Sequence, residues 1–341
     1  MEPRPESPPR RPARSLSFGV AVVGAGLMGR WHAHAAARSG GRVLAVVDPD
    51  IARARELARR YPGCIPDTRL DAALAASRPQ IAHLCTPTDT HEALTRRALD
   101  AGCHVLVEKP LAPTLAVTRQ LLDLAAERNL LLCPVHQFIF QRGVLRTRAW
   151  LPDLGAVRHI DAVICSAGAD GLASTARDQV AADVLPHPLS LLARLLGPTF
   201  SDMAWHVDRP ACGELRLSAS AAGTSAGILI SMSGRPTMNL LRIIADKGCV
   251  HCDLFHGFAT IERGTVSRTH KILRPFEASG ASMIAAANNL ARRLVTSEYA
   301  YPGLAELVGQ FATAVNEGGS SPISPAETLA VAAARDTIVG Q

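Results

Sequence analysis

The chain has 341 residues, of which 48% are hydrophobic and 19% charged, a composition that supports sizeable cores and excludes a disordered or fibrous protein. Its 36 basic and 30 acidic residues give a net charge of +6. This small, scattered excess argues against a dedicated nucleic-acid-binding protein, which would cluster Lys and Arg on one face. The length exceeds that of one ordinary core, so we expect two domains.

The first residues and the cysteines indicate a cytoplasmic protein. Residues 1–17 are rich in Pro and Arg and are expected to form a disordered tail. Arg10 and Arg11 precede an apolar stretch that imitates an export signal, but a strand and a turn explain that stretch better. No run approaches the ~18 apolar residues of a membrane span. The eight cysteines form no disulfide framework, and the C-x-x-C of Cys249 and Cys252 lacks the second pair that a metal site needs.

The segment GAGLMG follows an apolar run that ends at residue 23 and precedes an Ala-rich helical segment that ends near residue 38. This is the G-x-G-x-x-G pattern of dinucleotide-binding loops. Gly24 permits the tight turn, Gly26 lets the backbone approach a pyrophosphate, and Gly29 lets helix and strand pack closely. Leu27 and Met28 lie at the helix N-terminus, whose free N–H groups would face the phosphates.

A second apolar run, at 43–47, ends at Asp48, 19 positions after the last glycine of the loop. A carboxylate at this place accepts hydrogen bonds from the adenosine ribose and disfavours a 2′-phosphate. NAD is therefore expected rather than NADP. Arg53 and Arg55 lie close enough in sequence to weaken that preference.

Further strands alternate with helices up to residue 136. A strand at 81–85 ends at Thr86 and Pro87, and Thr90 would cap a helix that begins near His91. A strand at 104–107 runs into Glu108 and Lys109, a helix follows at 114–128, and a strand at 130–135 leads to His136. This alternation predicts a parallel, doubly wound sheet whose ligands bind at the carboxyl ends of the strands. The glycine loop, Asp48, Thr86, Lys109 and His136 would share that edge.

Taken together, these motifs resemble the Gfo/Idh/MocA oxidoreductases, which include glucose–fructose oxidoreductase and inositol dehydrogenase. The matching stretches are VVGAGLMGRWH, the acid of VVDPD, CTPTDTH, HVLVEKPLA and VHQF. The resemblance covers residues 18 to about 340 and fades between 265 and 300. It implies a Rossmann domain at 18–137 and an α+β domain at 138–341 with an open, mostly antiparallel sheet.

The resemblance also implies site residues. The expected cofactor contacts come from every strand end of the first domain: Gly24, Gly26, Leu27, Met28, Gly29, Asp48, Thr86, Pro87, His91, Glu108, Lys109 and His136. Residues 181–187 (AADVLPH) look like the family's D-x-x-x-H motif, which makes Lys109, Asp183 and His187 the expected catalytic set. His187 can shuttle a proton near neutral pH. Asp183 would hold its imidazole in the productive tautomer, and Lys109 would polarise the reacting oxygen.

Two departures from the family motif affect this set. Ser190 stands where the family often has an acidic residue, and Pro186 and Pro188 bracket His187. Because Pro188 cannot donate a helical hydrogen bond, we expect the helix over 189–196 to start near it or to kink there.

In the second domain the sequence predicts strands at 156–165, 214–219, 226–231, 240–245 and 249–253. The implied activity is hydride transfer between NAD(P) and a hydroxyl or keto carbon of a sugar, a cyclitol or a related polar metabolite. A non-catalytic NAD(P)- or metabolite-sensing regulator is an alternative, as are imine reduction and a redox-neutral, NAD-dependent lyase or hydrolase. The implied partners are a small-molecule substrate and further copies of the chain, which would form a dimer or tetramer through the exposed face of the open sheet. No nucleic acid, membrane or metal is implied. The sequence leaves open the substrate, the direction of transfer and the oligomer size.

Overall fold

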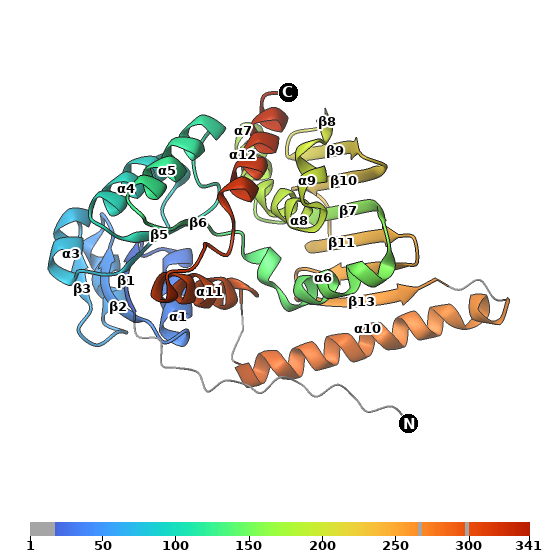
Figure 1. The fold of residues 1–341 in the computed structure, drawn as a ribbon, viewed down its shortest axis with the longest axis horizontal. Helices are drawn as coiled ribbons and strands as arrows, with labels where there is room; N and C mark the ends of the chain where they lie inside the picture. Colours follow the sequence, from blue (N-terminus) through green and yellow to red (C-terminus); the bar gives the residue numbers. More distant parts are fainter. Residues whose placement is uncertain (1–17, 265–267, 297–299) are drawn as a thin grey trace.

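A computed structural model describes residues 18–264, 268–296 and 300–341, so the expected disordered tail lies outside the described residues. Two sheets lie side by side, one in each half of the molecule (Figure 1). The first has the order β3-β2-β1-β4-β5-β6 and is parallel throughout. Its strands are β1 (Gly19–Val23), β2 (Arg42–Val47), β3 (Ile65–Asp67), β4 (Ile81–Leu84), β5 (His104–Val107) and β6 (Leu132–Pro134). The predicted doubly wound Rossmann sheet is confirmed.

Helices follow the strands of the first sheet because each crossover must return the chain to the same edge. They are α1 (Leu27–Arg38), α2 (Ile51–Ala58), α3 (Leu70–Ser77), α4 (Thr88–Asp100) and α5 (Leu115–Glu127). The period-two alternation of the strands separates two apolar layers. Ala21 and Val23 of β1 pack with buried residues of α3, α4 and α5. Val20 and Val22 join a cluster that continues into the second half of the molecule.

The second sheet has the order β13-β12-β11-β7-β10-β9-β8, and only the β10–β7 pair is parallel. Its strands are β7 (Val157–Cys165), β8 (Ala204–Asp208), β9 (Glu214–Ala221), β10 (Thr224–Ser231), β11 (Met238–Ala245), β12 (Gly248–Asp253) and β13 (Phe258–Arg263). Alternate residues of β11 are buried and exposed, as expected when one face packs on helices and the other is open. The predicted open, mostly antiparallel sheet is confirmed.

The remaining helices follow the first sheet in the chain, and the last two of them join the two halves. They are the 3-10 helix η1 (Gln137–Phe140), α6 (Arg142–Leu154), α7 (Ser174–Val184), α8 (Pro186–Leu196), α9 (Pro198–Ser201), α10 (Arg268–Thr296), α11 (Leu304–Glu317) and α12 (Pro325–Val339). Helix α11 packs on α1, and α12 packs between α5 and α8. The Leu115 N–H donates to the Asp336 carboxylate at 2.6 Å, so the last helix is tied to the first domain. None of the helices described here is long and apolar enough to cross a membrane.

Of two predicted helix starts, the one near His91 is wrong. Helix α4 begins at Thr88, with Pro87 as its N-cap, and Thr90 lies inside the first turn, where its hydroxyl contacts the Thr86 hydroxyl and the Pro87 carbonyl at 2.7 Å. Helix α8 begins at Pro186, two residues before Pro188, so the expected start near Pro188 is confirmed. Both prolines fit because the first turn of a helix needs no N–H donors.

Candidate active site

The glycine-rich loop joins β1 to α1 in the manner that a close phosphate approach requires. Gly24 has φ +94°, and a Cβ there would lie 2.5 Å from the Cys85 carbonyl oxygen. A Cβ at Gly29 would lie 1.7 Å from the Gly24 oxygen, whereas one at Gly26 would meet nothing within 4 Å. Gly24 therefore makes the turn from strand to helix, and Gly29 lets the helix pack closely on the loop. Gly26 leaves open space at the helix N-terminus.

Asp48 fixes this loop from the end of β2. Its carboxylate accepts hydrogen bonds from the Ala25 N–H at 2.8 Å and the Asp50 N–H at 2.9 Å, and the side chain is buried. The carboxylate lines a cleft of about 1220 Å³ together with Gly24, Gly26 and Arg53. Arg53 lies 3.4 Å from the Asp50 carboxylate, which offsets part of its positive charge. The cleft is large enough for a nucleotide.

The loop after β4 forms the opposite wall of the cleft, where Thr86 and Pro87 line it. His91 lies behind this wall and is buried. Its Nδ1 lies 2.8 Å from the Pro110 carbonyl oxygen, and its Nε2 lies 2.9 Å from the Thr86 carbonyl oxygen. His91 thus connects the loop after β4 to the loop after β5.

Lys109 extends from the end of β5 toward the second domain. Its Nζ donates to the backbone carbonyl of Asp183, near the end of α7, at 2.9 Å. Burial lowers the pKa of Lys109, while the charges of Glu108 and Asp183 oppose that shift. The Asp183 carboxylate accepts from Gln179 Nε2 at 2.9 Å. The predicted Asp183–His187 hydrogen bond is therefore absent from the described structure, because α7 ends between them and the carboxylate turns back along its own helix.

Two histidines face the same ammonium group. Burial, the charge of Lys109 and then that of His136 hold the pKa of His187 well below its usual range. Burial and Lys109 lower the pKa of His136 to about 3. The Nδ1 atoms of His187 and His136 are buried without a partner among the described residues, and the His187 ring stacks on Phe138 at 4.3 Å. Such unpaired groups point to a ligand-binding site.

Ser190, at the position of the missing acid, donates its hydroxyl to the His187 carbonyl at 2.9 Å. It is fully buried and so serves the first turn of α8 rather than presenting a polar group to a ligand.

Glu108 ends a buried chain of polar side chains that sequence reasoning missed. His32 Nε2 lies 3.1 Å from a Glu108 carboxylate oxygen, and His32 Nδ1 lies 3.2 Å from His83 Nδ1. Because an ionised carboxylate only accepts, His32 donates from Nε2 to Glu108. The ring nitrogens Nδ1 of His32 and His83 share the second contact, in which one of them donates to the other. His83 stands in the apolar strand IAHL, where nothing in the pattern marks it as polar-paired.

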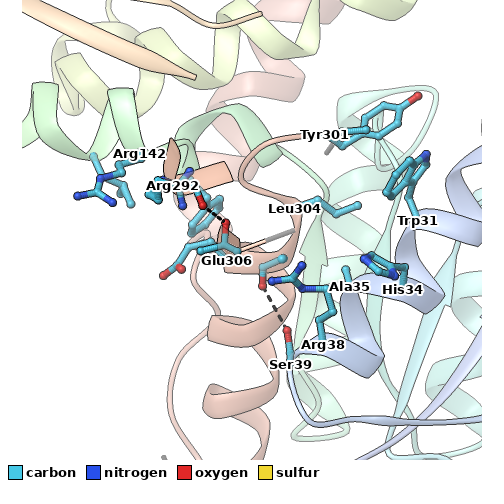
Figure 2. A pocket seen from close by; sticks show the side chains of 15 residues that line it. Trp31, His34, Ala35, Arg38, Ser39, Arg142, Arg292, Tyr301, Leu304 and Glu306 are labelled. Atoms are coloured by element: carbon cyan, nitrogen blue, oxygen red, sulfur yellow. Dashed lines mark hydrogen bonds between the residues drawn. The ribbon is translucent and has the colours of Figure 1, made fainter. Parts of the chain in front are cut away.

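A second pocket, of about 410 Å³, lies along α1 (Figure 2). The Trp31 and Tyr301 rings meet at one end of it, with centroids 5.6 Å apart. Arg142 and Arg292 lie at the other end, near Glu306 (Figure 2). Trp31 thus packs against the loop before α11, as expected for a residue of the first helix. This pocket is separate from the glycine-rich cleft.

The structure distributes the predicted residues over three places. The glycine-rich cleft is lined by Gly24, Gly26, Asp48, Thr86 and Pro87. Lys109, His136, Asp183 and His187 meet between the domains. The loops are held in place by residues that do not line the cleft, namely Gly29, His91 and Glu108. Leu27, 64% exposed, and Met28 lie on α1 outside the lining of the cleft.

No group of three or more His, Cys, Asp or Glu that could hold a metal ion exists in the part of the chain that the structure describes. Cys249 and Cys252 belong to β12. The Cys249 thiol lies 3.4 Å from His251 Nε2, and the Cys252 thiol lies 3.1 Å from the Thr147 hydroxyl.

Comparison with known proteins identifies relatives of the first domain. Residues 18–136 match a family described as "Oxidoreductase family, NAD-binding Rossmann fold". An inositol 2-dehydrogenase of Corynebacterium glutamicum (strain R) is 40% identical over 101 residues, which are 29% of this chain and 30% of that protein. A dTDP-3,4-didehydro-2,6-dideoxy-alpha-D-glucose 3-reductase of Streptomyces violaceoruber is 33% identical over 54% of this chain and 55% of that protein. The matched segments thus span less than two thirds of these relatives.

Solved structures extend the likeness of the fold to both domains. A UDP-N-acetylglucosamine 3-dehydrogenase from Acidithiobacillus ferrooxidans has a TM-score of 0.74 at 21% identity, over 94% of this chain and 96% of that chain. GenD2 from gentamicin A biosynthesis, in complex with NAD, has a TM-score of 0.72 at 22% identity over 100% and 96%. A 3-ketoreductase from Actinomadura kijaniata, in complex with NADP, has a TM-score of 0.72 at 20% identity over 95% and 97%.

Proposed function

Because residues 18–136 belong to the Gfo/Idh/MocA oxidoreductases, we propose that the protein is an NAD-dependent dehydrogenase or ketoreductase. Its substrate is a sugar, a cyclitol or a related polar metabolite, and hydride is transferred to or from a hydroxyl or keto carbon of that molecule. The observation that carries the proposal is the meeting of the Lys109 ammonium group with two buried, unpaired imidazole nitrogens, beside a glycine-rich cleft. Relatives named for inositol and for a deoxysugar nucleotide support the substrate class.

The cleft residues fit a dinucleotide. Gly26 leaves open the space that a Cβ would fill, and the α1 N-terminus offers N–H groups to a pyrophosphate. When bound, the nicotinamide supplies or accepts the hydride. The Asp48 carboxylate favours NAD because a ribose 2′-phosphate beside it would be repelled. A fluorescence titration is expected to give a lower dissociation constant for NADH than for NADPH, and the reverse order would refute the preference.

Lys109 positions the reacting oxygen in this proposal. Its Nζ donates to the Asp183 carbonyl, and an ammonium retains further protons with which it can bind a substrate oxygen. Asp183 acts on Lys109 through its backbone, which replaces the predicted contact with His187. Stabilising a developing alkoxide by a buried cation is typically the strongest electrostatic contribution at such a carbon.

His187 exchanges the proton. Its lowered pKa keeps the imidazole neutral near pH 7, so Nδ1 or Nε2 can accept the alcohol proton during oxidation. During carbonyl reduction the same ring would return that proton. The stacking on Phe138 holds the ring plane in place during either step.

The experiment that tests this proposal is a spectrophotometric screen of polyols, sugars and nucleotide sugars for a change in NADH absorbance. With an active substrate, Lys109→Met and His187→Asn are expected to lower kcat by about 100-fold to 10,000-fold while the dissociation constant for NADH changes little. Ser190→Ala is the matched control, because its hydroxyl only serves α8, and it should retain turnover. Full turnover in Lys109→Met or His187→Asn would refute the assigned roles. Tight NADH binding without turnover on any substrate would favour the regulator.

A further inference from the structure

Helix α10 carries the largest set of exposed apolar side chains in the described chain. It is 29 residues long, about 44 Å at the rise of an α-helix, and it runs along the open edge of the second sheet beside β13 (Figure 1). Eight of its large apolar side chains are exposed: Ile272 71%, Leu273 53%, Phe276 75%, Met283 70%, Ile284 61%, Leu290 61%, Leu294 60% and Val295 86%. A monomeric surface rarely leaves so continuous an apolar stripe in water.

The stripe faces away from the rest of the molecule. The body-facing side of α10 is marked by contacts such as that of Asn289, whose side chain donates to the His256 carbonyl at 2.8 Å. At 100° per residue, Met283 and Leu290 lie about 120° and 100° around the helix from Asn289. They lie about 180° and 160° from Arg274, which donates to the Glu262 carboxylate of β13 at 2.8 Å. The apolar face therefore has no covering element within the described chain.

The stripe has the spacing of a helix–helix seam. Four of the eight residues, together with two small residues between them, follow one another in steps of four and three residues: Phe276, Gly280, Met283, Ala287, Leu290 and Leu294. This alternation is the heptad pattern whose side chains insert between those of a facing helix. The stretch at 278–291 contains no charged residue, although a solvated helix face would ordinarily carry several.

Large and small side chains alternate along the stripe so that it fits a second, antiparallel copy of itself. When a copy of α10 is laid antiparallel about an axis near residue 285, Leu290 faces Gly280 and Met283 faces Ala287. Phe276 then faces Leu294, which closes both ends, and Ile284 meets its own equivalent beside the axis. A two-fold interface requires a patch that fits itself in this way, and facing large with small residues gives close packing.

We propose that α10 is a dimerisation helix, which pairs antiparallel with α10 of a second copy of this chain. The inference does not depend on the catalytic proposal, because α10 contributes none of the residues assigned to catalysis. It also names a surface other than the open sheet face through which the family resemblance implies oligomerisation. A larger assembly can use both surfaces, and α10 then supplies one of its two-fold axes.

The first test measures mass by light scattering at about 50 µM chain. The wild-type mass is expected to be a multiple of two chains of 36.1 kDa, and Met283→Glu combined with Leu290→Glu should halve it. Val339→Glu is the matched control, because Val339 is also exposed, at 45%, but lies on α12, and its mass should equal that of the wild type. Unchanged far-UV circular dichroism confirms folding. A wild-type mass of one chain, or an unchanged mass in the double variant, would overturn the proposal.

The second test determines the orientation by disulfide trapping. In the antiparallel pair, Phe276→Cys combined with Leu294→Cys places each new thiol opposite one of the partner's, so a covalent dimer should form under mild oxidation. Leu294→Cys alone leaves the two thiols at opposite ends and should stay at the wild-type background, which includes the exposed Cys212. A dimer from Leu294→Cys alone would show parallel pairing, and no dimer from the double variant would show that Phe276 and Leu294 of two copies do not face each other. Either result refutes the proposed pair.

Discussion

Replacing two glycines of one loop should separate cofactor binding from folding. In Gly29→Ala the new Cβ would lie 1.7 Å from the Gly24 carbonyl oxygen, well inside the ~3.4 Å of an ordinary contact. The loop or α1 must therefore move by more than an ångström, an overpacking that costs about 1–3 kcal/mol. Gly29→Ala is expected to lower Tm by several degrees.

In Gly26→Ala the new Cβ meets nothing within 4 Å, and the backbone at φ −69°, ψ −162° suits any residue. The folded state should therefore keep its Tm within about 1 °C. The methyl group enters the space through which a pyrophosphate would reach the helix N-terminus. Losing one charge-assisted hydrogen bond costs about 1.5–3 kcal/mol, so the dissociation constant for NADH should rise about 10-fold to 150-fold.

The two variants are measured by thermal unfolding without ligand and by NADH fluorescence titration. Each serves as the control of the other, because both add one methyl group to the same loop. Unchanged NADH affinity in Gly26→Ala would refute the view that the loop backbone approaches the pyrophosphate. Unchanged Tm in Gly29→Ala would refute the packing role of that glycine.

Three further predictions concern stability. Burial raises the pKa of Glu108, but His32 and Lys109 outweigh burial and leave the pKa below its ordinary value. Glu108→Gln should therefore lower the free energy of unfolding by about 1–3 kcal/mol at pH 7. Urea titrations should show this difference between the variant and the wild type shrinking as pH falls below about 4.5. Burial holds the pKa of His83 well below its usual range, so protons favour the unfolded chain below about pH 6.5. His83→Leu should reduce the fall in unfolding free energy between pH 6.5 and 5 by up to about 1.4 kcal/mol per pH unit, and an unchanged slope would contradict the buried neutral ring. Arg194 contacts the Glu327 carboxylate at 2.8 Å and the Pro322 carbonyl at 2.9 Å, so Arg194→Lys, which loses this fork, should lower Tm more than Arg53→Lys on the exposed face of α2.

The Rossmann half could be predicted from the sequence because its chemistry is local. The glycines of the loop stand at a fixed spacing between one strand and one helix, and the strands end at polar residues that mark one edge of the sheet. The resemblance to the Gfo/Idh/MocA oxidoreductases is confirmed over residues 18–136, where its motifs are these strand ends. The strands over 156–165, 214–219, 226–231, 240–245 and 249–253 are likewise confirmed within a few residues.

Other features depend on tertiary contacts that no spacing reveals. The Asp183–His187 contact was implied by the family motif alone. In the structure the Asp183 carboxylate accepts from Gln179, and Lys109 donates to the Asp183 carbonyl. His83 lies in an otherwise apolar strand, and only the fold brings it to His32. Helix α10 (Arg268–Thr296) was not predicted, and it lies where the family resemblance fades, between residues 265 and 300.

The return of α12 to the first domain limits how this protein can be divided. Leu115 bonds to Asp336 across 221 residues of sequence, and the Arg335 guanidinium donates to the Pro113 carbonyl at 2.8 Å. A fragment cut at residue 137 would lack this helix and expose the apolar side of α5 that it covers. We therefore propose that the cofactor-binding unit is discontinuous in sequence. A fusion of this domain to another protein would have to include residues 325–339. Any hinge motion between the two sheets must also accommodate α12, which contacts both halves.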